Sequence, residues 1–239
     1  MSPLLLVLAF AVQSPPLPGY SLAWHDEFDG TALDTTKWEY RGLGPRRDAI
    51  NTRDAVTVSG GMLHITTTKV GDEYHTGMIA TSGKYSTAFG YFEARLRLQK
   101  QVGHWSAFWL QSPQMGQVGD PQKFGTEIDV IEYLRREEET AQINLHWDGY
   151  GKNHKHAGTQ AHVDGLGSGF HTFGLEWTPV VYRFFVDGRE VWKTDKAVSH
   201  LAEFMLLSIE VGDWAGDIKG AELPDGIDVD WVRVWKKEG

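Results

Sequence analysis

Cysteine is absent from the 239 residues of this chain, which excludes disulfide bonds and thiol chemistry but leaves the cellular compartment open. An excess of basic residues is missing as well. The formal net charge is −9, so the broad positive surface that binds phosphates is not available, and we expect no nucleic-acid partner. No apolar run approaches the roughly 20 residues that a spanning helix needs, and we expect no membrane span.

Long amphipathic helical patterns and linker-like composition are also absent, and short alternating segments take their place. In Phe89–Gln99 every second residue is apolar, which is typical of a strand with one buried face. Asp187-Gly188 lies between two such segments, Val180–Val186 and Glu190–Lys193, and predicts a hairpin. We therefore predict an all-β fold, a two-sheet antiparallel β-sandwich, in a single domain over residues 20–239.

The N-terminus carries a short apolar run, Leu4–Val12, with the small-x-small sequence Ala9-Phe10-Ala11, followed by prolines at positions 15, 16 and 18. This pattern is typical of the apolar core and cleavage region of a signal peptide, although no basic residue precedes His25. We predict a signal peptide and a proline-rich segment over residues 1–19, and hence a secreted or periplasmic protein. A short apolar strand or a disordered extension is the alternative.

The segment Glu127–Tyr133 places three carboxylates among β-branched apolar residues. In a strand, Glu127 and Asp129 share one face with their Cα atoms roughly 6.6 Å apart, whereas Glu132 has the wrong parity. One extra residue bulged at Val130–Ile131 would return Glu132 to the acidic face. Two glutamates leaning toward each other then approach the carboxyl separation of about 5–5.5 Å that retaining glycosidases use. Such crowding favours one protonated and one ionised acid, as acid catalysis and nucleophilic attack require.

A helix is the competing interpretation of the same segment. Thr126 and Asp129 fit a capping box, and Ile128, Ile131 and Leu134 fall at helical spacing. Taken alone, the segment would then be an exposed helix with solvated acids. The strand-like rhythm of the rest of the chain favours the bulged strand.

The string Glu127-Ile-Asp-Val-Ile-Glu132 resembles the E-x-D-x-x-E signature of glycoside hydrolase family 16, which includes laminarinases and agarases. The resemblance covers about residues 22–236. Further matching segments are Trp24–Asp29, Leu33–Trp38, Gly60–Leu63, Phe89–Arg95, Gly103–Trp109, Phe170–Trp177 and Asp230–Trp235. The resemblance implies a concanavalin-like β-jelly roll with a concave substrate cleft, and a retaining endo-β-glycosidase.

The resemblance also implies a role for each acid. Glu127 is expected to be the nucleophile and Glu132 the general acid and base, while Asp129 hydrogen-bonds within the cluster. Spacing alone does not say which glutamate has which role. Trp105 and Trp109 are expected to stack on sugar rings beside the cleavage point, with an ordinary core position as the alternative for either.

Three more residues complete the expected substrate site. Pairing the alternating segment Ala141–Trp147 with the acidic strand would bring His146 close to the carboxylates, and the resembled family has a histidine there. Asn144 lies on the same polar side, and Trp214 lies in a glycine-flanked loop that would reach the cleft. A lone histidine is more often structural, which is the alternative for His146.

We expect no catalytic cofactor, and the resemblance implies a structural Ca²⁺ held by Glu27, Gly61 and Asp230, because oxygen ligands suit a hard cation. Asp230 facing solvent is the alternative. Residues 147–169 contain several histidines, but no further ligand follows at zinc-site spacing. We therefore predict a loop at the cleft edge over these residues instead of a zinc site.

The expected partner is a polysaccharide, bound by a monomer, and the resemblance points first to a β-1,3- or mixed β-1,3/1,4-glucan. Gly103–Trp109 resembles the laminarinase segment, except that Ser106 stands where a proline is usual. A galactan of the agarose, carrageenan or porphyran type is the alternative, and the arginines within Arg41–Arg53 would suit a sulfated chain. A non-catalytic lectin-like module is a different class, which three intact acids disfavour. Transglycosylation is also open.

Overall fold

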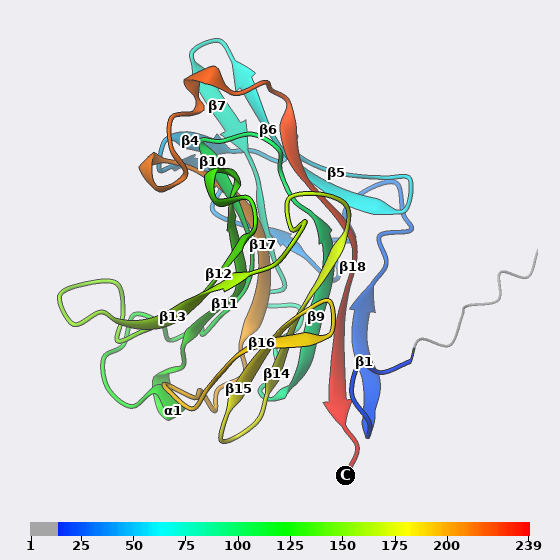
Figure 1. Cartoon of the computed structure of the whole chain (residues 1–239), viewed down its shortest axis with the longest axis vertical. Helices are drawn as coiled ribbons and strands as arrows, with labels where there is room; N and C mark the ends of the chain where they lie inside the picture. The colour runs from blue at the N-terminus through cyan, green and yellow to red at the C-terminus, as the bar shows by residue number, and fades with distance from the viewer. Residues whose placement is uncertain (1–13) are drawn as a thin grey trace, which may run out of the picture.

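The computed structural model describes residues 14–239, and these form two β-sheets stacked face to face (Figure 1). Residues 1–13, which include the apolar run of the predicted signal peptide, lie outside the described residues, so the signal peptide and its boundary stay a prediction. None of the helices within residues 14–239 is long and apolar enough to cross a membrane.

The larger sheet has eleven strands, nearly all antiparallel to their neighbours; β4 and β7 pair in parallel. Beside its main path, β1 (Tyr20–Asp26) pairs with β18 and β5 (Val56–Ser59) pairs with β6. The order along the path is β16 (Arg189–Thr194), β15 (Tyr182–Val186), β14 (His171–Trp177), β9 (Gly90–Arg97), β18 (Asp225–Lys237), β6 (Met62–Val70), β7 (Glu73–Thr76), β4 (Ala49–Asn51) and β3 (Gly44–Arg46).

The smaller sheet has seven antiparallel strands and carries the acidic segment near its middle. Its order is β13 (Lys155–His162), β12 (Thr140–Trp147), β11 (Glu127–Leu134), β10 (His104–Gln111), β17 (Phe204–Val211), β8 (Met78–Ala80) and β2 (Glu39–Tyr40). The short helical turns in the described chain are α1 (Pro121–Phe124), η1 (Arg135–Glu137), η2 (Asp213–Ala215) and η3 (Ile218–Gly220).

The core lies between the two sheets and is filled from both by alternate residues of each strand. Phe92 of β9 and Phe108 of β10 are completely buried there, and so is Trp38, which packs in from the connection after β1. Burying a large apolar side chain contributes about 1.5–3 kcal/mol, so this layer provides most of the stability. The opposite face of the seven-stranded sheet is left free to carry polar side chains.

The predicted all-β sandwich is confirmed, and the helical alternative for the acidic segment is wrong, because Glu127–Leu134 is a strand. The Asp187-Gly188 hairpin between β15 and β16 is also confirmed, with both residues at positive φ (49° and 75°), as a type I′ turn requires.

The predicted loop over residues 147–169 is wrong in part. Residues 147–169 include β13, an edge strand whose only buried residue is Ala157, so it shows no apolar alternation and is held by its ladder with β12. Residues 41–53 include the short strands β3 and β4, which are too brief for a periodic signal.

Candidate active site

Strand β11 contains the predicted bulge. Asp129 pairs with Asn144 on β12, and Glu132 pairs with Gln142, so three steps along β11 match two steps along β12. At the bulge two consecutive residues, Val130 and Ile131, both point into the core between the sheets. Glu132 therefore returns to the face that carries the other two acids.

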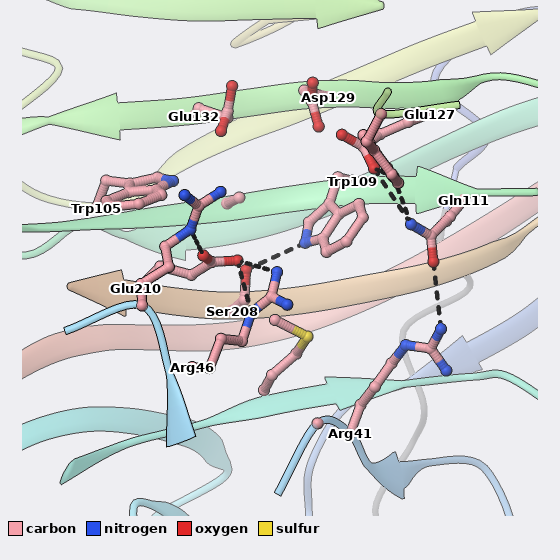
Figure 2. A pocket seen from close by; sticks show the side chains of 15 residues that line it. Arg41, Arg46, Trp105, Trp109, Gln111, Glu127, Asp129, Glu132, Ser208 and Glu210 are labelled. Carbon is pink, nitrogen blue, oxygen red and sulfur yellow. Dashed lines mark hydrogen bonds and ion pairs between the residues drawn. The ribbon is translucent and has the colours of Figure 1, made fainter. Parts of the chain in front are cut away.

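All three acids line one cavity of about 600 Å³ on the outer face of the seven-stranded sheet. Figure 2 shows Glu132, Asp129 and Glu127 in a row along β11, with Trp105 and Trp109 on the neighbouring β10. The remaining lining residues are Arg41, Gly42, Arg46, Arg47, Met78, Ala107, Gln111, Tyr150, Ser208 and Glu210.

Glu132 is placed as a proton donor. Its Oε2 accepts a hydrogen bond of 2.9 Å from Nδ2 of Asn144. Burial, followed by the charge of Asp129, raises the pKa of Glu132 to about 8. The carboxyl group therefore carries its proton at neutral pH, which is the state that a general acid needs.

Glu127 receives two donors that favour its ionised form. The Tyr150 hydroxyl and the Gln111 side-chain amide both donate to Oε2 of Glu127, the latter at 3.2 Å. Burial raises the pKa of Glu127, and the hydrogen bond from Tyr150 is the strongest influence that opposes this rise. The arrangement holds one carboxylate oxygen and leaves the other available for attack.

Asp129, between the two glutamates, is 4% exposed. Burial, followed by the charge of Glu127, raises the pKa of Asp129 well above its ordinary value. His146 lies on the neighbouring strand β12. Its Nε2 is 3.4 Å from Oδ2 of Asp129, and its Nδ1 is 2.9 Å from Nε2 of His154. The strand pairing thus brings His146 to the carboxylates as predicted.

The two tryptophans of β10 face the cavity and lie outside the main core, although little of each is exposed (5% for Trp105, 7% for Trp109). Trp109 donates from Nε1 to the Ser208 hydroxyl at 3.1 Å. Trp214 contacts the cavity indirectly: its ring meets Trp105 edge-on at 5.4 Å, and it is not among the lining residues. Contact of these three rings with a sugar stays a prediction.

A family model for glycosyl hydrolases family 16 matches residues 44–233. The chain belongs to this family. It is 28% identical over 260 aligned positions to a β-glucanase of Rhodothermus marinus, covering 94% of this chain and 88% of that one. It is 26% identical to a keratan-sulfate endo-1,4-β-galactosidase of Sphingobacterium multivorum, covering 91% of this chain and 55% of that relative's length.

Among solved structures, the laminarinase of Flavobacterium sp. UMI-01 superposes with a TM-score of 0.79 at 26% identity, covering 90% of this chain and all of that one. Family membership, together with the glucanase and glycanase relatives, makes the chain an endo-acting glycoside hydrolase. The family resemblance read from the acidic motif is confirmed.

Several residues of this family 16 site were not predicted from the sequence. Tyr150 lies in an irregular turn with no periodicity, so no local signal marks it. Glu210 ion-pairs with Arg46 at 2.6 Å and with Arg47, whose guanidinium lies 5.1 Å from the Trp105 ring centre. Glu210 and Ser208 alternate along β17, and that polar alternation could have marked them. Arg41, Arg46 and Arg47 all line the cavity.

The predicted calcium ligands are arranged differently. Glu27 forms a two-point ion pair with Arg233 (3.0 and 2.8 Å), and Asp230 pairs with Arg95 at 2.5 Å. Gly61 lies in the turn between β5 and β6 at a φ of 75°. Because each carboxylate is directed to an arginine, the set as it stands does not fit a cation, and the calcium site stays a prediction.

Proposed function

We propose that this family 16 chain cleaves internal β-1,3-linkages of a glucan, with or without neighbouring β-1,4-linkages, by a retaining double displacement. The observation that carries the proposal is the β11 bulge, which turns Glu127, Asp129 and Glu132 into one cavity. Two glutamates with different surroundings on one strand are the parts that a retaining mechanism uses.

In the first step the glycosidic oxygen takes the proton of Glu132 as Glu127 attacks the anomeric carbon, so the leaving chain departs and a glycosyl-enzyme ester forms. In the second step Glu132, now ionised, removes a proton from water, which attacks the same carbon and releases Glu127. The sugar keeps its β configuration because it is inverted twice. The hydrogen bonds from Tyr150 and Gln111 support the charge of Glu127 before attack and after release.

Asp129 and His146 are proposed to adjust the proton affinity of Glu132 during these two steps. The charge of Asp129 contributes to the raised pKa of Glu132, and His146 lies beside Asp129 across the strand pair. Asn144 orients Glu132 through its amide. Trp105 and Trp109 offer aromatic surface to sugar rings on either side of the scissile bond, with Trp214 behind Trp105.

A glucan substrate is supported by the relatives named β-glucanase and laminarinase. A galactan is the second candidate, since Arg41, Arg46 and Arg47 line the cavity and a keratan-sulfate galactosidase is among the relatives. Glu210 already ion-pairs with Arg46 and Arg47, which reduces the positive charge left for a sulfate and favours the neutral glucan.

The test is incubation of the purified chain with laminarin, lichenan, agarose and carrageenan while reducing ends and product lengths are followed. We expect reducing ends from laminarin and lichenan, early products of intermediate length, and the β-anomer first by NMR. Cleavage of agarose or carrageenan, without cleavage of laminarin or lichenan, would show that the substrate is a galactan and not a glucan. Binding to laminarin without new reducing ends would indicate a lectin-like module. Adding oligosaccharide acceptors separates transglycosylation from hydrolysis.

The proposal includes secretion and a monomeric enzyme, for which the apolar run Leu4–Val12 and the polymeric substrate are the support. Expression of the full chain, followed by assay of medium, periplasm and cytoplasm, tests the first point. Activity confined to the cytoplasm, with Met1 retained, would contradict it. Light scattering of the active fraction tests the second.

A further inference from the structure

Three side chains at the centre of the cleft form a potential metal-binding set. Glu127, Asp129 and His146 each offer one ligand atom, and these atoms lie within 4.8 Å of one another. Their positions are determined by adjacent strands, because Glu127 and His146 are direct partners in the β11–β12 ladder and Asp129 lies two residues from Glu127. The set is therefore preorganised by backbone pairing.

The Asp129 carboxylate is directed into this set without a hydrogen bond on one oxygen. Its side chain is 5% exposed, and Oδ2 has no hydrogen-bond partner within residues 14–239. The nearest charged or titratable nitrogen is Nε2 of His146, at 3.4 Å. Buried polar atoms of this kind are nearly always satisfied, so a proton, a water molecule or a cation belongs next to this oxygen.

His146 is oriented as a metal ligand. Its Nδ1 lies 2.9 Å from Nε2 of His154, and the hydrogen bond is satisfied when Nδ1–H of His146 donates to His154. In that tautomer Nε2 of His146 keeps its lone pair, on the side that faces Asp129. Histidines that bind metals commonly donate their second ring N–H to an acceptor in this way.

We propose that Glu127, Asp129 and His146 bind a divalent transition-metal ion such as Zn²⁺, in competition with the substrate. One imidazole and two carboxylates suit zinc, copper or nickel better than calcium or magnesium. Bound there, the ion occupies the carboxylate of Glu127 and blocks attack on the sugar. The metal binding stands on the geometry alone, and only the inhibition rests on the proposed function.

A second cluster, Glu139, His162 and Asp164, provides the matched control. Its ligand atoms are also within 4.8 Å of one another, but all three residues are exposed. His162 already pairs with Asp164 at 2.9 Å, and Glu139 accepts from the backbone N–H of Gly165 at 3.4 Å. Without a buried unpartnered atom, this cluster is expected to bind weakly or not at all.

The direct test is titration of the full chain with Co²⁺, followed by visible absorption, and with Zn²⁺, followed by calorimetry. We expect one ion per chain for the wild type and for His162→Gln, and loss of that binding in His146→Gln. His154→Leu should weaken binding about 10–100-fold, while His154→Gln, which keeps an acceptor, should weaken it less. Circular dichroism checks that each variant is folded.

Zn²⁺ should raise the apparent KM on laminarin, and a chelator should restore it. His162→Gln should be inhibited like the wild type, and His154→Leu less. No binding, equal binding by His146→Gln, or binding lost in His162→Gln would overturn the proposal. One ion bound through His146 by a chain that cleaves none of the tested glycans would support the metal site while contradicting the proposed function.

Discussion

Two acids on the outer face of the eleven-stranded sheet, Asp228 and Asp230, have surroundings opposite to those of the acids in the cleft of the seven-stranded sheet. On the larger sheet Asp228 ion-pairs with Arg97 and accepts from His64 at 2.5 Å, and Asp230 pairs with Arg95. Both of these carboxylates have an arginine partner.

In the cleft, Glu127, Asp129 and Glu132 lie side by side, and the hydrogen-bond donors to the two glutamates are neutral amides and a phenol. Within residues 14–239, no arginine or lysine forms an ion pair with any of the three. Of the arginines that line the cavity, Arg46 and Arg47 ion-pair with Glu210 on β17, and Arg41 ion-pairs with Glu39. Acids kept together without a cation strain the folded state, and they obtain the raised pKa values that acid catalysis uses.

The largest expected contrast comes from the same amide substitution on the two faces. Glu127→Gln and Glu132→Gln should each lower kcat/KM by at least about 10²–10⁴-fold, because each removes a catalytic carboxyl group. Asp228→Asn should leave kcat/KM unchanged and lower Tm, because Arg97 and His64 lose their partner. Glu132→Gln should keep or raise Tm. Steady-state kinetics measure kcat/KM and thermal melts measure Tm. Equal losses of activity from substitutions on the two faces would contradict the proposed difference between them.

A smaller effect is expected from Tyr150→Phe, which removes one neutral donor from the cleft. Hydrogen bonds to charged groups contribute about 1.5–3 kcal/mol, so kcat/KM should fall roughly 10–150-fold. The pKa of Glu127 should rise, which moves the acidic limb of the pH–rate profile to higher pH. Tyr74→Phe, at a ring that stacks on Lys69, is the control. An unmoved acidic limb would show that Tyr150 does not support the nucleophile.

Glu203 is also a buried acid with a raised pKa, but it lies outside the cleft, and we expect it to affect stability and not catalysis. It is 1% exposed, its Oε1 accepts from the Thr126 N–H at 3.0 Å, and burial raises its pKa from 4.5 to about 8. A raised folded-state pKa gives stability that is complete below the unfolded value and is lost as pH rises through about 8. Tm should therefore fall between these pH values, and less so in Glu203→Gln. The exposed variant Glu190→Gln should follow the wild type; identical curves for all three would contradict the assignment.

The smallest effect is expected at the predicted calcium ligands. Asp230→Asn should cost about 0.2–1 kcal/mol, as for other partly exposed ion pairs, because it breaks only the contact with Arg95. EDTA should leave Tm unchanged, because Glu27 and Asp230 are directed to arginines. A fall of Tm in EDTA that calcium reverses, and that Asp230→Asn abolishes, would show that the calcium prediction was right and this arrangement wrong.

Patterns of local periodicity predicted much of this molecule. Alternation in Phe89–Gln99 identified a strand and its buried face, and the parity of Glu127, Asp129 and Glu132 required the bulge that the register confirms. These features depend on neighbours in the chain and on one buried face, which sequence shows directly.

The parts that sequence missed depend on contacts between distant segments. Tyr150 reaches Glu127 from a turn 23 positions away, and Arg46 reaches Glu210 across 164 positions. Strand β13 is polar because it is a sheet edge, so its pairing with β12 left no apolar pattern. Arg233 and Arg95, which meet the expected calcium ligands, were likewise invisible to any local motif.

Azide rescue tests most directly whether the two glutamates of the bulged strand divide the reaction between them. With an activated aryl β-glycoside and azide, Glu127→Ala should give the α-glycosyl azide, because azide enters from the side that the nucleophile vacated. Glu132→Ala should give the β-glycosyl azide, because azide then attacks the glycosyl-enzyme. The reverse pair of products would exchange the two roles, and rescue of neither variant would contradict the catalytic assignment.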